Sequence, residues 1–366
     1  MDKDICVGTT DIKTIENPQP GIAIGESLKR KGYKVIGIDD APLTAALVLP
    51  FFDNVYILPK FRNYNLEFLK REFKKLRKKE NLKIFIPGYD TDVHFFSKHR
   101  EEFEEIGIKM LLPSLNSLNL SSKQNLSKLR EHNIEVPTTF KVKDRDALKK
   151  ISKKLEFPLM VKGLVKGAYI AKNTKDILFF YEKIKQDPEC GKTNEILLQE
   201  FIKGSIFSIA GVVDSKSRLV RSVQMKKLAI DSKGTTWAGY TVKEEILEKI
   251  TRKIIKIINW TGPFEFEFVK EKNTGKFFLI EINPRLPAWI HLATMAGQNF
   301  PEAIVRICLG EKIKVKRNYK VNLFFTRVGL EVTFPLKYIL NSGNGIKIEN
   351  LNNKDLILDF FYNDNK

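Results

Sequence analysis

The sequence predicts an N-terminal α/β domain built on a parallel sheet, followed by a larger α+β region. Within the first 112 residues, short apolar segments alternate with charged stretches of helical periodicity. Continuous apolar strands separated by helices indicate a parallel sheet whose two faces are both covered. We expect strands at 5–8, 34–39, 54–59 and 83–88, with a helix at 22–31 between the first two.

After residue 112 the pattern changes to paired strands and amphipathic helices. We expect a connecting helix within 117–139, which Ser121 or Ser122 caps and Pro137 ends. The later elements are a strand pair in 157–172, a helix at 174–186, strands through 196–242, a helix at 244–259, a strand pair in 263–283 and a helix near 288–309. This organisation predicts domains at 1–112 and 113–312 and a small strand-containing segment at 313–366.

The net charge of +19 allows two interpretations. The densest basic block, at 70–80, contains apolar residues at helical spacing (Leu66, Leu69, Phe73 and Leu76), which predicts a buried stripe with solvated lysines opposite it. A basic face can also neutralise an anionic partner. No arginine-rich tail, zinc pattern or aromatic–basic interleaving accompanies the charge, so nucleic acid is the less favoured partner.

The chain lacks signals for a membrane or an export route. No apolar run reaches the roughly 18 residues that a membrane span needs, and the acidic start MDKDICVGTT is not typical of a secretory signal. Cys6, Cys190 and Cys308 are far apart and have no histidine at metal spacing. We therefore expect a reduced, cytoplasmic protein.

Polar loops follow the predicted N-terminal strands at 9–21, 39–40 and 88–92. In a parallel sheet, such loops meet at the carboxyl edge, where ligands of open α/β sheets bind. We interpret them as a substrate-facing rim. The alternative is that their Asp, Gly and Pro residues only form turns.

The segment from Phe264 to Arg285 carries the most specific chemistry. Acids and phenylalanines alternate in FEFEF, which places them on opposite faces of a strand. A hairpin can bring Glu267 opposite Glu281, and two close carboxylates repel each other unless a cation or proton lies between them. Together with Asn283, these oxygens suit Mg2+. The alternative is an amphipathic hairpin whose acids face water.

The spacing of Glu267 and the EINPR segment at 281–285 resembles the metal-binding signature of the ATP-grasp superfamily. Lys123, before a helix and an Ile-Glu-Val-Pro segment, and Lys162, in FPLMVKG, resemble the two lysines that bind ATP phosphates there. The resemblance covers roughly residues 1–310. It implies a two-lobed ATP-grasp fold after a parallel pre-ATP-grasp domain, with ATP and Mg2+ (or Mn2+) as cofactors.

The same resemblance assigns the adenine to a hinge between the lobes, at Gln199, Glu200, Phe201 and Ile202. The alternative for this segment is a plain core strand. Two features depart from the family pattern. The loop after Lys162 has only Gly163 and Gly167 around Lys166, and Ile206 occupies the position of the acid that commonly holds the ribose.

The reaction that the resemblance implies is ATP-dependent joining of a carboxylate to an amine through an acyl phosphate. Arg285 and Lys226, or Lys227 beside it, would then be catalytic. The partners would be small-molecule or peptide carboxylates and amines, and a homodimer is compatible with the superfamily. The alternative, favoured by the two departures, is an ATP-binding scaffold of the same fold that has lost turnover.

Overall fold

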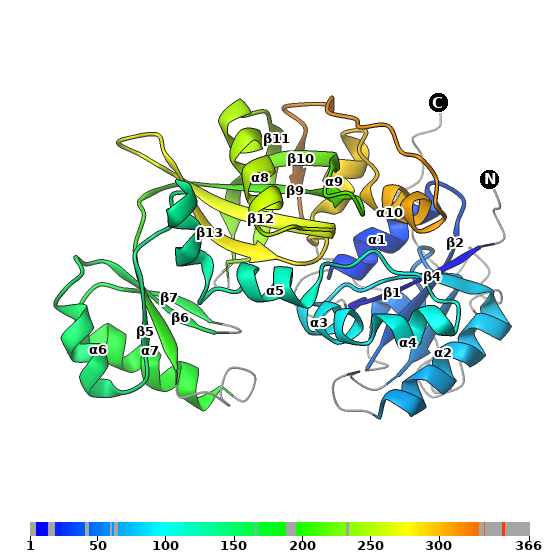
Figure 1. Ribbon diagram of the computed structural model, residues 1–366, viewed down its shortest axis with the longest axis horizontal. Helices are drawn as coiled ribbons and strands as arrows, with labels where there is room; N and C mark the ends of the chain where they lie inside the picture. Colours follow the sequence, from blue (N-terminus) through cyan, green and yellow to red (C-terminus); the bar gives the residue numbers. More distant parts are fainter. Residues whose placement is uncertain are drawn as a thin grey trace.

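The computed structural model describes residues 5–13, 19–40, 44–58, 61, 65–164, 167–187, 195–231, 234–328, 333 and 346–347. Their strands form sheets of five, six and four strands. Figure 1 shows the five-stranded sheet on the right, the six-stranded sheet at the top centre and the four-stranded sheet at the lower left. The predicted parallel N-terminal sheet followed by an α+β region is confirmed.

The N-terminal sheet has the order β15-β3-β2-β1-β4, and β3, β2, β1 and β4 run parallel. Its strands are β1 (Cys6–Thr10), β2 (Lys34–Asp39), β3 (Asn54–Ile57) and β4 (Leu82–Ile86), with β15 (Ile346–Lys347) antiparallel at the β3 edge. All four predicted strands are therefore present. The described part of the C-terminal segment contributes β15 to this sheet rather than forming a sheet of its own.

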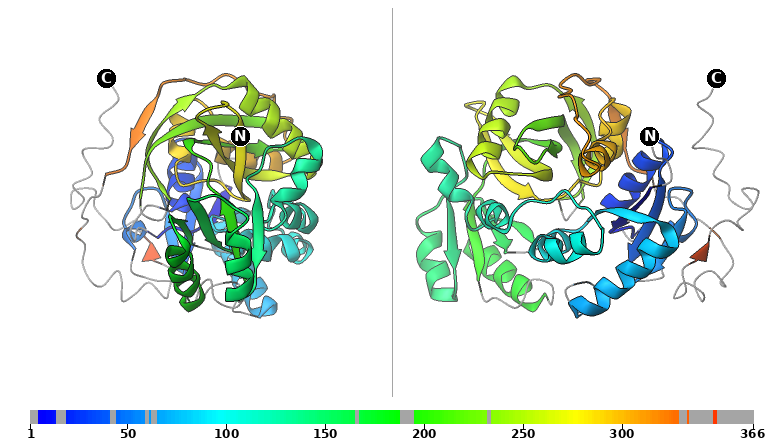
Figure 2. Two further views of the ribbon diagram at one scale, coloured as in Figure 1. Left: turned by 90° about the vertical axis from the view of Figure 1, so that its left-hand side faces the viewer. Right: turned by 45° about the vertical axis from the view of Figure 1, so that its right-hand side comes forward.

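Helices cover both faces of this sheet (Figure 2). One face carries α1 (Pro20–Lys29), and a single turn, η1 (Ala45–Leu47), follows β2. The other face carries α2 (Leu66–Glu80), α3 (Asp90–Lys98) and α4 (Arg100–Glu105). In α2, Leu69, Phe73 and Leu76 are buried as predicted, and Leu66 is partly buried.

The close approach of β1 and α1 requires glycine at residue 21. A Cβ atom on Gly21 would lie 2.1 Å from the Thr10 carbonyl oxygen, which is far inside contact distance. Because Pro20 supplies the first helical position, its missing N–H costs α1 nothing. The helix can thus begin directly at the carboxyl edge of the sheet.

The connection to the next lobe differs from the prediction. Helix α5 (Leu115–Ser121) is capped by Ser114, whose side chain accepts a hydrogen bond from the Ser117 N–H. The predicted cap at Ser121 or Ser122 is wrong, because Ser121 ends the helix and Ser122 is already extended. A 3-10 helix, η3 (Leu126–His132), follows and ends at Asn133 in the left-handed region.

The four-stranded sheet has the order β5-β8-β6-β7, and its neighbouring strands are antiparallel. Its strands are β5 (Thr139–Val142), β6 (Leu159–Gly163), β7 (Ala168–Ala171) and β8 (Ile196–Glu200). Helices α6 (Arg145–Ser152) and α7 (Thr174–Gln186) pack on it and share with it a separate apolar core. The predicted strand pair in 157–172 and the helix at 174–186 are confirmed.

The six-stranded sheet has the order β13-β12-β9-β10-β11-β14, and it is antiparallel throughout. Its strands are β9 (Gly204–Val213), β10 (Leu219–Ile230), β11 (Thr236–Val242), β12 (Gly262–Glu271), β13 (Phe277–Asn283) and β14 (Phe324–Thr326). Helix α8 (Glu245–Ile257) packs on one face. The other face packs on α9 (Ile290–Met295) and α10 (Phe300–Cys308), which also contact α1.

The single helix predicted near 288–309 is two helices. Gly297 lies at a φ of +93°, in the left-handed region that ends helices, and Asn299 then caps α10 by accepting from the Glu302 N–H. This break turns the chain so that both short helices pack against α1.

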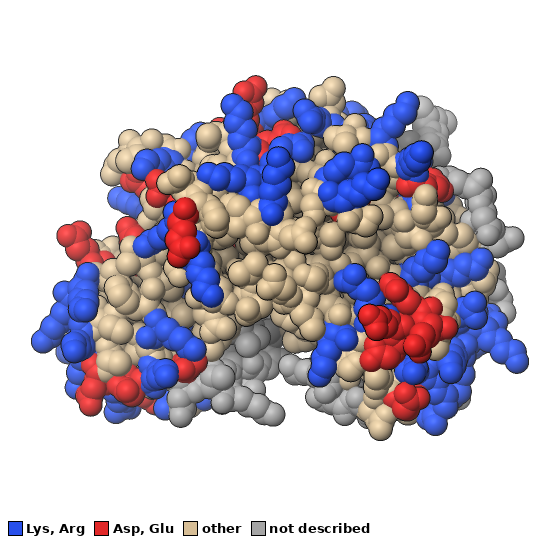
Figure 3. Space-filling view, in the orientation of Figure 1, with Lys and Arg blue, Asp and Glu red and all other residues tan. Residues whose placement is uncertain are grey.

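Positive charge is distributed over the surface. On the face shown in Figure 3, lysines and arginines lie on every lobe and are interspersed with acids. Within the described residues, no helix combines the length and the apolar character needed to cross a bilayer.

Replacing Phe266 by alanine should destabilise the chain strongly. Phe266 is fully buried, and its ring lies against Phe264 and Trp260. The lost burial and the cavity should cost about 3–5 kcal/mol of unfolding free energy, measured by chemical denaturation. Phe179→Ala is the matched control, because Phe179 is 64% exposed. Equal losses in the two variants would contradict the assigned core.

Candidate functional site

The acids of β12 face the single acid and the amide of β13 across the predicted hairpin. Glu267 pairs directly with Glu281, and Glu265 pairs with Asn283. On the opposite face of β12, Phe264, Phe266 and Phe268 are fully buried against α8. The predicted register of the two glutamates is therefore confirmed.

Two lysines from distant parts of the chain bind these glutamates. The Lys123 Nζ, in the turn after α5, lies 2.9 Å from Glu281 Oε1. The Lys227 Nζ, on β10, lies 2.7 Å from Glu267 Oε1. Both acids are partly buried, and a carboxylate in such surroundings is disfavoured unless it is paired, so these ammonium groups explain how both acids are tolerated.

The surroundings separate the pKa values of the two glutamates. Burial would raise the pKa of Glu281, but Lys123 and Lys162 outweigh it and hold that pKa well below its usual range. Burial raises the pKa of Glu267, and Glu265 and Glu281 nearby add to the rise despite Lys227. Negative charge at Glu267 is therefore incompletely compensated, and a further cation there would stabilise it.

Lys162 approaches the same acids from the other lobe. It lies on β6 of the four-stranded sheet and is buried. Burial, opposed by Glu281 and reinforced by Lys123, lowers the pKa of Lys162 to about 8. The two predicted phosphate-binding lysines thus lie in one electrostatic cluster with Glu281, although they come from different lobes.

The prediction that Lys226 reaches this cluster is corrected. Lys226 pairs with Phe207 across β9 and β10, and its Nζ lies 5.8 Å from the Phe207 ring centroid. Phe207 belongs to the core on the α8 face of the sheet. Because side chains alternate along a strand, Lys227 is the residue that points to the acids.

Glu265 holds the third predicted ligand and Arg285 in place, a role that the sequence analysis missed. It is buried, accepts a 2.6 Å hydrogen bond from Trp289 Nε1 and accepts one of 3.1 Å from Asn283 Nδ2. Arg285 Nη1 lies 3.6 Å from Glu265 Oε2, and its Nε lies 3.0 Å from Asp90 Oδ1. The alternation in FEFEF was the available signal, since it places Glu265 on the same face as Glu267.

The predicted hinge lies where the chain passes between the two antiparallel sheets. Gln199 and Glu200 end β8, whereas Phe201 and Ile202 lead into β9 of the other sheet. Gln199 Nε2 donates to Thr139 Oγ1 at 2.8 Å, and the Glu200 side chain accepts from the Thr138 N–H at 2.9 Å. The segment therefore connects the lobes, and its last two residues are not part of a core strand.

Two features depart from the family pattern, the loop after Lys162 and Ile206, and the structure describes only part of the loop. The Gly163 N–H donates a 2.9 Å hydrogen bond to the Gly167 carbonyl. Lys166 lies outside the described residues. Ile206 lies on β9, paired with Val269 of β12.

The donors on β12 and β13 fit a hard divalent cation. Glu267 and Glu281 supply carboxylate oxygens. Asn283 donates a hydrogen bond to Glu265 through Nδ2, so its amide oxygen can serve as a metal ligand. Among the described residues, no three His, Cys, Asp or Glu side chains converge on a preformed metal centre. The set is therefore incomplete by itself and suits Mg2+, which usually keeps water or phosphate oxygens in its remaining positions.

A group of carboxylates lies beside Arg285 at the carboxyl edge of the N-terminal sheet. Thr10 Oγ1 donates to Asp92 at 2.7 Å, and Lys13 forms ion pairs with Asp39 and Asp40. Burial raises the pKa of Asp92 to about 7 and that of Asp39 to about 6. The three predicted rim loops therefore do meet, although residues 14–18 of the first lie outside the described part.

Two family models match the chain. Residues 192–326 match the family described as "ATP-grasp in the biosynthetic pathway with Ter operon", and residues 22–111 match the PylC-like N-terminal domain.

Among curated proteins, the chain is 24% identical over 352 residues to the carbamoyl phosphate synthase large chain of Thermoanaerobacter pseudethanolicus, covering 89% of this chain and 32% of that protein. It is 23% identical to the N-terminal section of the Aquifex aeolicus large chain, covering 76% of this chain and 52% of that one. The chain thus spans about half or less of these relatives.

Solved structures show the same fold at low identity. The biotin carboxylase of Campylobacter jejuni, in a β,γ-ATP complex, matches with a TM-score of 0.66 and 18% identity over 87% of this chain and 74% of that chain. N5-carboxyaminoimidazole ribonucleotide synthetase of Thermotoga maritima matches with a TM-score of 0.58 and 18% identity over 87% and 79%.

Asp92→Asn should raise stability at neutral pH and have little effect in acid. The folded chain keeps a proton on Asp92 up to about pH 7, whereas the unfolded chain releases it near the ordinary pKa of 3.8. Unfolding therefore releases a proton between these values, and wild-type stability falls as the pH rises through this window. Asparagine cannot ionise and can still accept from Thr10.

The gain above pH 7 should be at least about 1 kcal/mol, measured by denaturation at pH 4.5 and pH 8. Asp146→Asn, at an exposed position on α6, controls for the change in net charge. A difference between wild type and Asp92→Asn that does not change with pH would contradict the assigned environment.

Proposed function

We propose that this chain, an ATP-grasp protein by its fold, is an ATP- and Mg2+-dependent ligase that joins a carboxylate to an amine or a similar nucleophile. One observation carries the proposal: Glu267 and Glu281 are paired across β12 and β13, with Lys123 and Lys227 bound to them. Lys162 faces the same acids from the second lobe.

The proposed reaction has two steps. A substrate carboxylate oxygen attacks the γ-phosphorus of ATP, the bond from that phosphorus to the β,γ-bridging oxygen breaks, and ADP leaves. The amine then attacks the acyl carbon, the carbon–oxygen bond to phosphate breaks, and the amine nitrogen loses a proton. Both steps depend mainly on positioning and on stabilisation of negative charge.

The cationic side chains of the site would supply that stabilisation. Lys123 and Lys162 are placed to bind polyphosphate oxygens from two lobes, and ammonium groups suit this flexible ligand. Glu267, Glu281 and Asn283 would hold Mg2+, which, when bound, neutralises charge on the phosphates. Lys227 keeps Glu267 in position from β10.

Arg285 is suited to bind the substrate carboxylate or the acyl phosphate. Its guanidinium lies between Glu265 and Asp90, so its orientation is fixed by groups from β12 and from α3. A planar fork held in this way can bind two oxygens of one anion. The adjacent rim carboxylates suit an amino group on the second substrate.

The nucleoside would lie against the hinge between β8 and β9, with Glu200 and Ile202 offering backbone groups to the purine. This end of the site has weaker support, because Ile206 cannot bind ribose hydroxyls. An ATP-binding scaffold without turnover is the second candidate, and the same residue favours it.

Glu281→Gln should remove Mg2+-dependent nucleotide binding and turnover. We expect ATP affinity in the presence of Mg2+, measured by calorimetry, to fall at least about tenfold, and ADP release with responsive carboxylates to fall roughly 100-fold. Acyl phosphate formation can be detected without knowing the amine, because hydroxylamine traps it as a hydroxamate. A panel of amino acids and short peptides provides the carboxylates.

Glu271→Gln is the matched control, since Glu271 ends the same strand but binds only the hairpin turn. Normal Mg2+–ATP binding without hydroxamate or ADP for any carboxylate would support the scaffold instead. Equal behaviour of the Glu271 and Glu281 variants would contradict the metal assignment.

Lys227→Met and Lys226→Met remove neighbouring lysines from opposite faces of β10, and we expect them to differ in stability and activity. The Lys227 variant leaves Glu267 buried without its ammonium partner, so we expect both lower stability and roughly 100-fold lower turnover. The Lys226 variant loses only a contact over the Phe207 ring and should retain most activity. Comparable losses of activity in the two variants would contradict the assignment of Lys227, rather than Lys226, to the site.

A further inference from the structure

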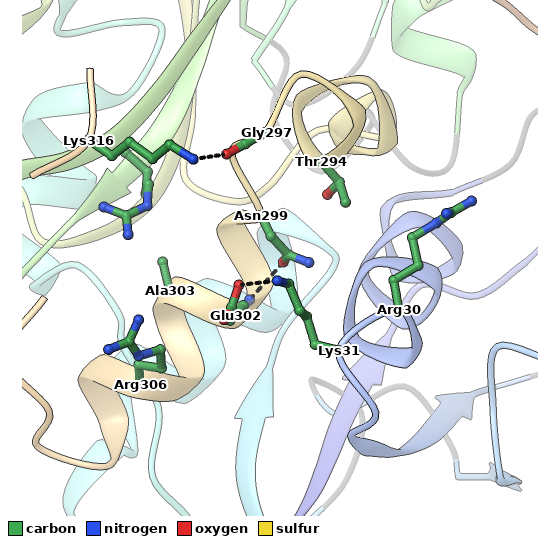
Figure 4. A pocket seen from close by; sticks show the side chains of 10 residues that line it. Arg30, Lys31, Thr294, Gly297, Asn299, Glu302, Ala303, Arg306 and Lys316 are labelled. Carbon is green, nitrogen blue, oxygen red and sulfur yellow. Dashed lines mark hydrogen bonds and ion pairs between the residues drawn. The ribbon is translucent and has the colours of Figure 1, made fainter. Parts of the chain in front are cut away.

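A basic cavity lies away from the site described above, where α1, the α9–α10 segment and β10 meet. Its volume is about 180 Å3. Figure 4 shows it lined by Arg30 and Lys31 after α1, by Thr294 of α9, by Gly297 and Asn299 between α9 and α10, and by Lys316. The cations in its lining are Arg30, Lys31, Arg221, Arg306 and Lys316, and the one carboxylate is Glu302.

Three of these cations have a carboxylate counter-charge. Arg30 pairs with Glu26 at 3.2 Å, Lys31 with Glu302 at 3.6 Å, and Arg306 with Glu311 at 2.7 Å. These pairs leave little net charge of their own.

The other two cations, Arg221 and Lys316, are held in place without being neutralised. Arg221 Nη1 donates to the Val220 carbonyl at 2.8 Å and to the Lys314 carbonyl at 2.6 Å. Lys316 Nζ donates to the Gly297 carbonyl at 2.8 Å. In the part of the chain that the structure describes, neither has a carboxylate within ion-pair distance, and Arg221 Nε and Nη2 make no hydrogen bond.

The backbone places these two residues side by side. Arg221 and Lys316 form an isolated parallel bridge, with the Lys316 N–H donating to the Val220 carbonyl at 3.1 Å. Burial lowers the pKa of Arg221, with Arg306 adding to the effect and Glu302 opposing it. Arg306 thus adds positive charge near the half-buried Arg221, and an anion bound between Arg221 and Lys316 would offset that charge.

The cavity is also separate from the nucleotide site. Arg221 and Lys227 are on the same strand, six residues apart, which corresponds to about 20 Å at the rise of an extended strand. Arg30 and Lys31 follow the carboxyl end of α1, whereas the rim lies at its amino end.

We propose that this cavity is a second anion site that binds a phosphate group. At roughly 30 Å3 per water, a volume of about 180 Å3 accommodates one such group with its water, but not a whole nucleotide. A guanidinium fork and a lysine converging from different segments match a multidentate tetrahedral oxyanion. Because the lining comes from α1, α10 and β10, an anion bound here also links the N-terminal sheet domain to the six-stranded sheet.

The test is titration of the full chain with inorganic phosphate, in saturating ADP and Mg2+, with KCl keeping the ionic strength constant. Calorimetry and thermal unfolding give affinity and stabilisation. We expect one phosphate to bind per chain at this site and to raise the unfolding temperature. Lys316→Gln and Arg221→Gln should each weaken binding at least tenfold. Lys312→Gln, at a nearby exposed position, should have no effect.

Lys162→Met separates this site from the nucleotide site. Under the proposal, phosphate binding survives Lys162→Met and is lost in Lys316→Gln. The reverse pattern, or no binding beyond that of chloride, would overturn the proposal. Should Arg221→Gln fail to fold, Lys316→Gln decides alone, since Lys316 occupies an exposed position where substitution is tolerated more readily. Glycerol phosphate distinguishes the source: tighter binding than inorganic phosphate indicates a phosphomonoester, and weaker binding indicates phosphate itself.

Discussion

The candidate site depends on one register, the antiparallel pairing of β12 with β13 that places Glu267 opposite Glu281 and Glu265 opposite Asn283. Because side chains alternate on a strand, this pairing puts all four polar groups on one face and the phenylalanines of β12 on the other. A slip of one residue would send the acids into the apolar core under α8. The core and the site thus enforce the same pairing.

Buried charge then determines which parts of the chain must come together. Each acid on this face has a cation or a donor from a different element: Lys123 from the turn after α5, Lys227 from β10 and Trp289 from the segment before α9. Removing one partner of such a pair leaves an uncompensated charge in a partly buried environment, which destabilises the folded chain. The cations therefore orient the acids. They also link the turn after α5 and strand β10 to the β12–β13 hairpin.

The two regions of positive charge differ in how they are balanced. At the proposed nucleotide site, carboxylates on β12 and β13 face the lysines directly, and a metal-bound polyphosphate would replace these carboxylates as counter-charges of the lysines. In the cavity beside α10, Arg221 and Lys316 are held by carbonyl oxygens, which orient a cation without cancelling its charge. An anion that binds in the cavity would therefore neutralise positive charge that the carbonyl oxygens leave in place.

The sequence by itself determined the alternating strands, the helical stripe of α2 and the facing of Glu267 and Glu281, because these depend on local periodicity and a short hairpin. The order of Lys123, Lys162 and the EINPR segment along the chain also showed the resemblance to the ATP-grasp pattern. Tertiary structure alone decided that Lys227 rather than Lys226 reaches Glu267, since a strand's pattern does not say which of its faces meets the acids. It also decided that Glu265 orients Asn283 and Arg285, and that Asp90 and Arg221 have partners far along the chain. The alternation in FEFEF shows only on which face Glu265 lies. The contacts of Asp90 and Arg221 join segments far apart in the sequence, for which local residue patterns carry no signal.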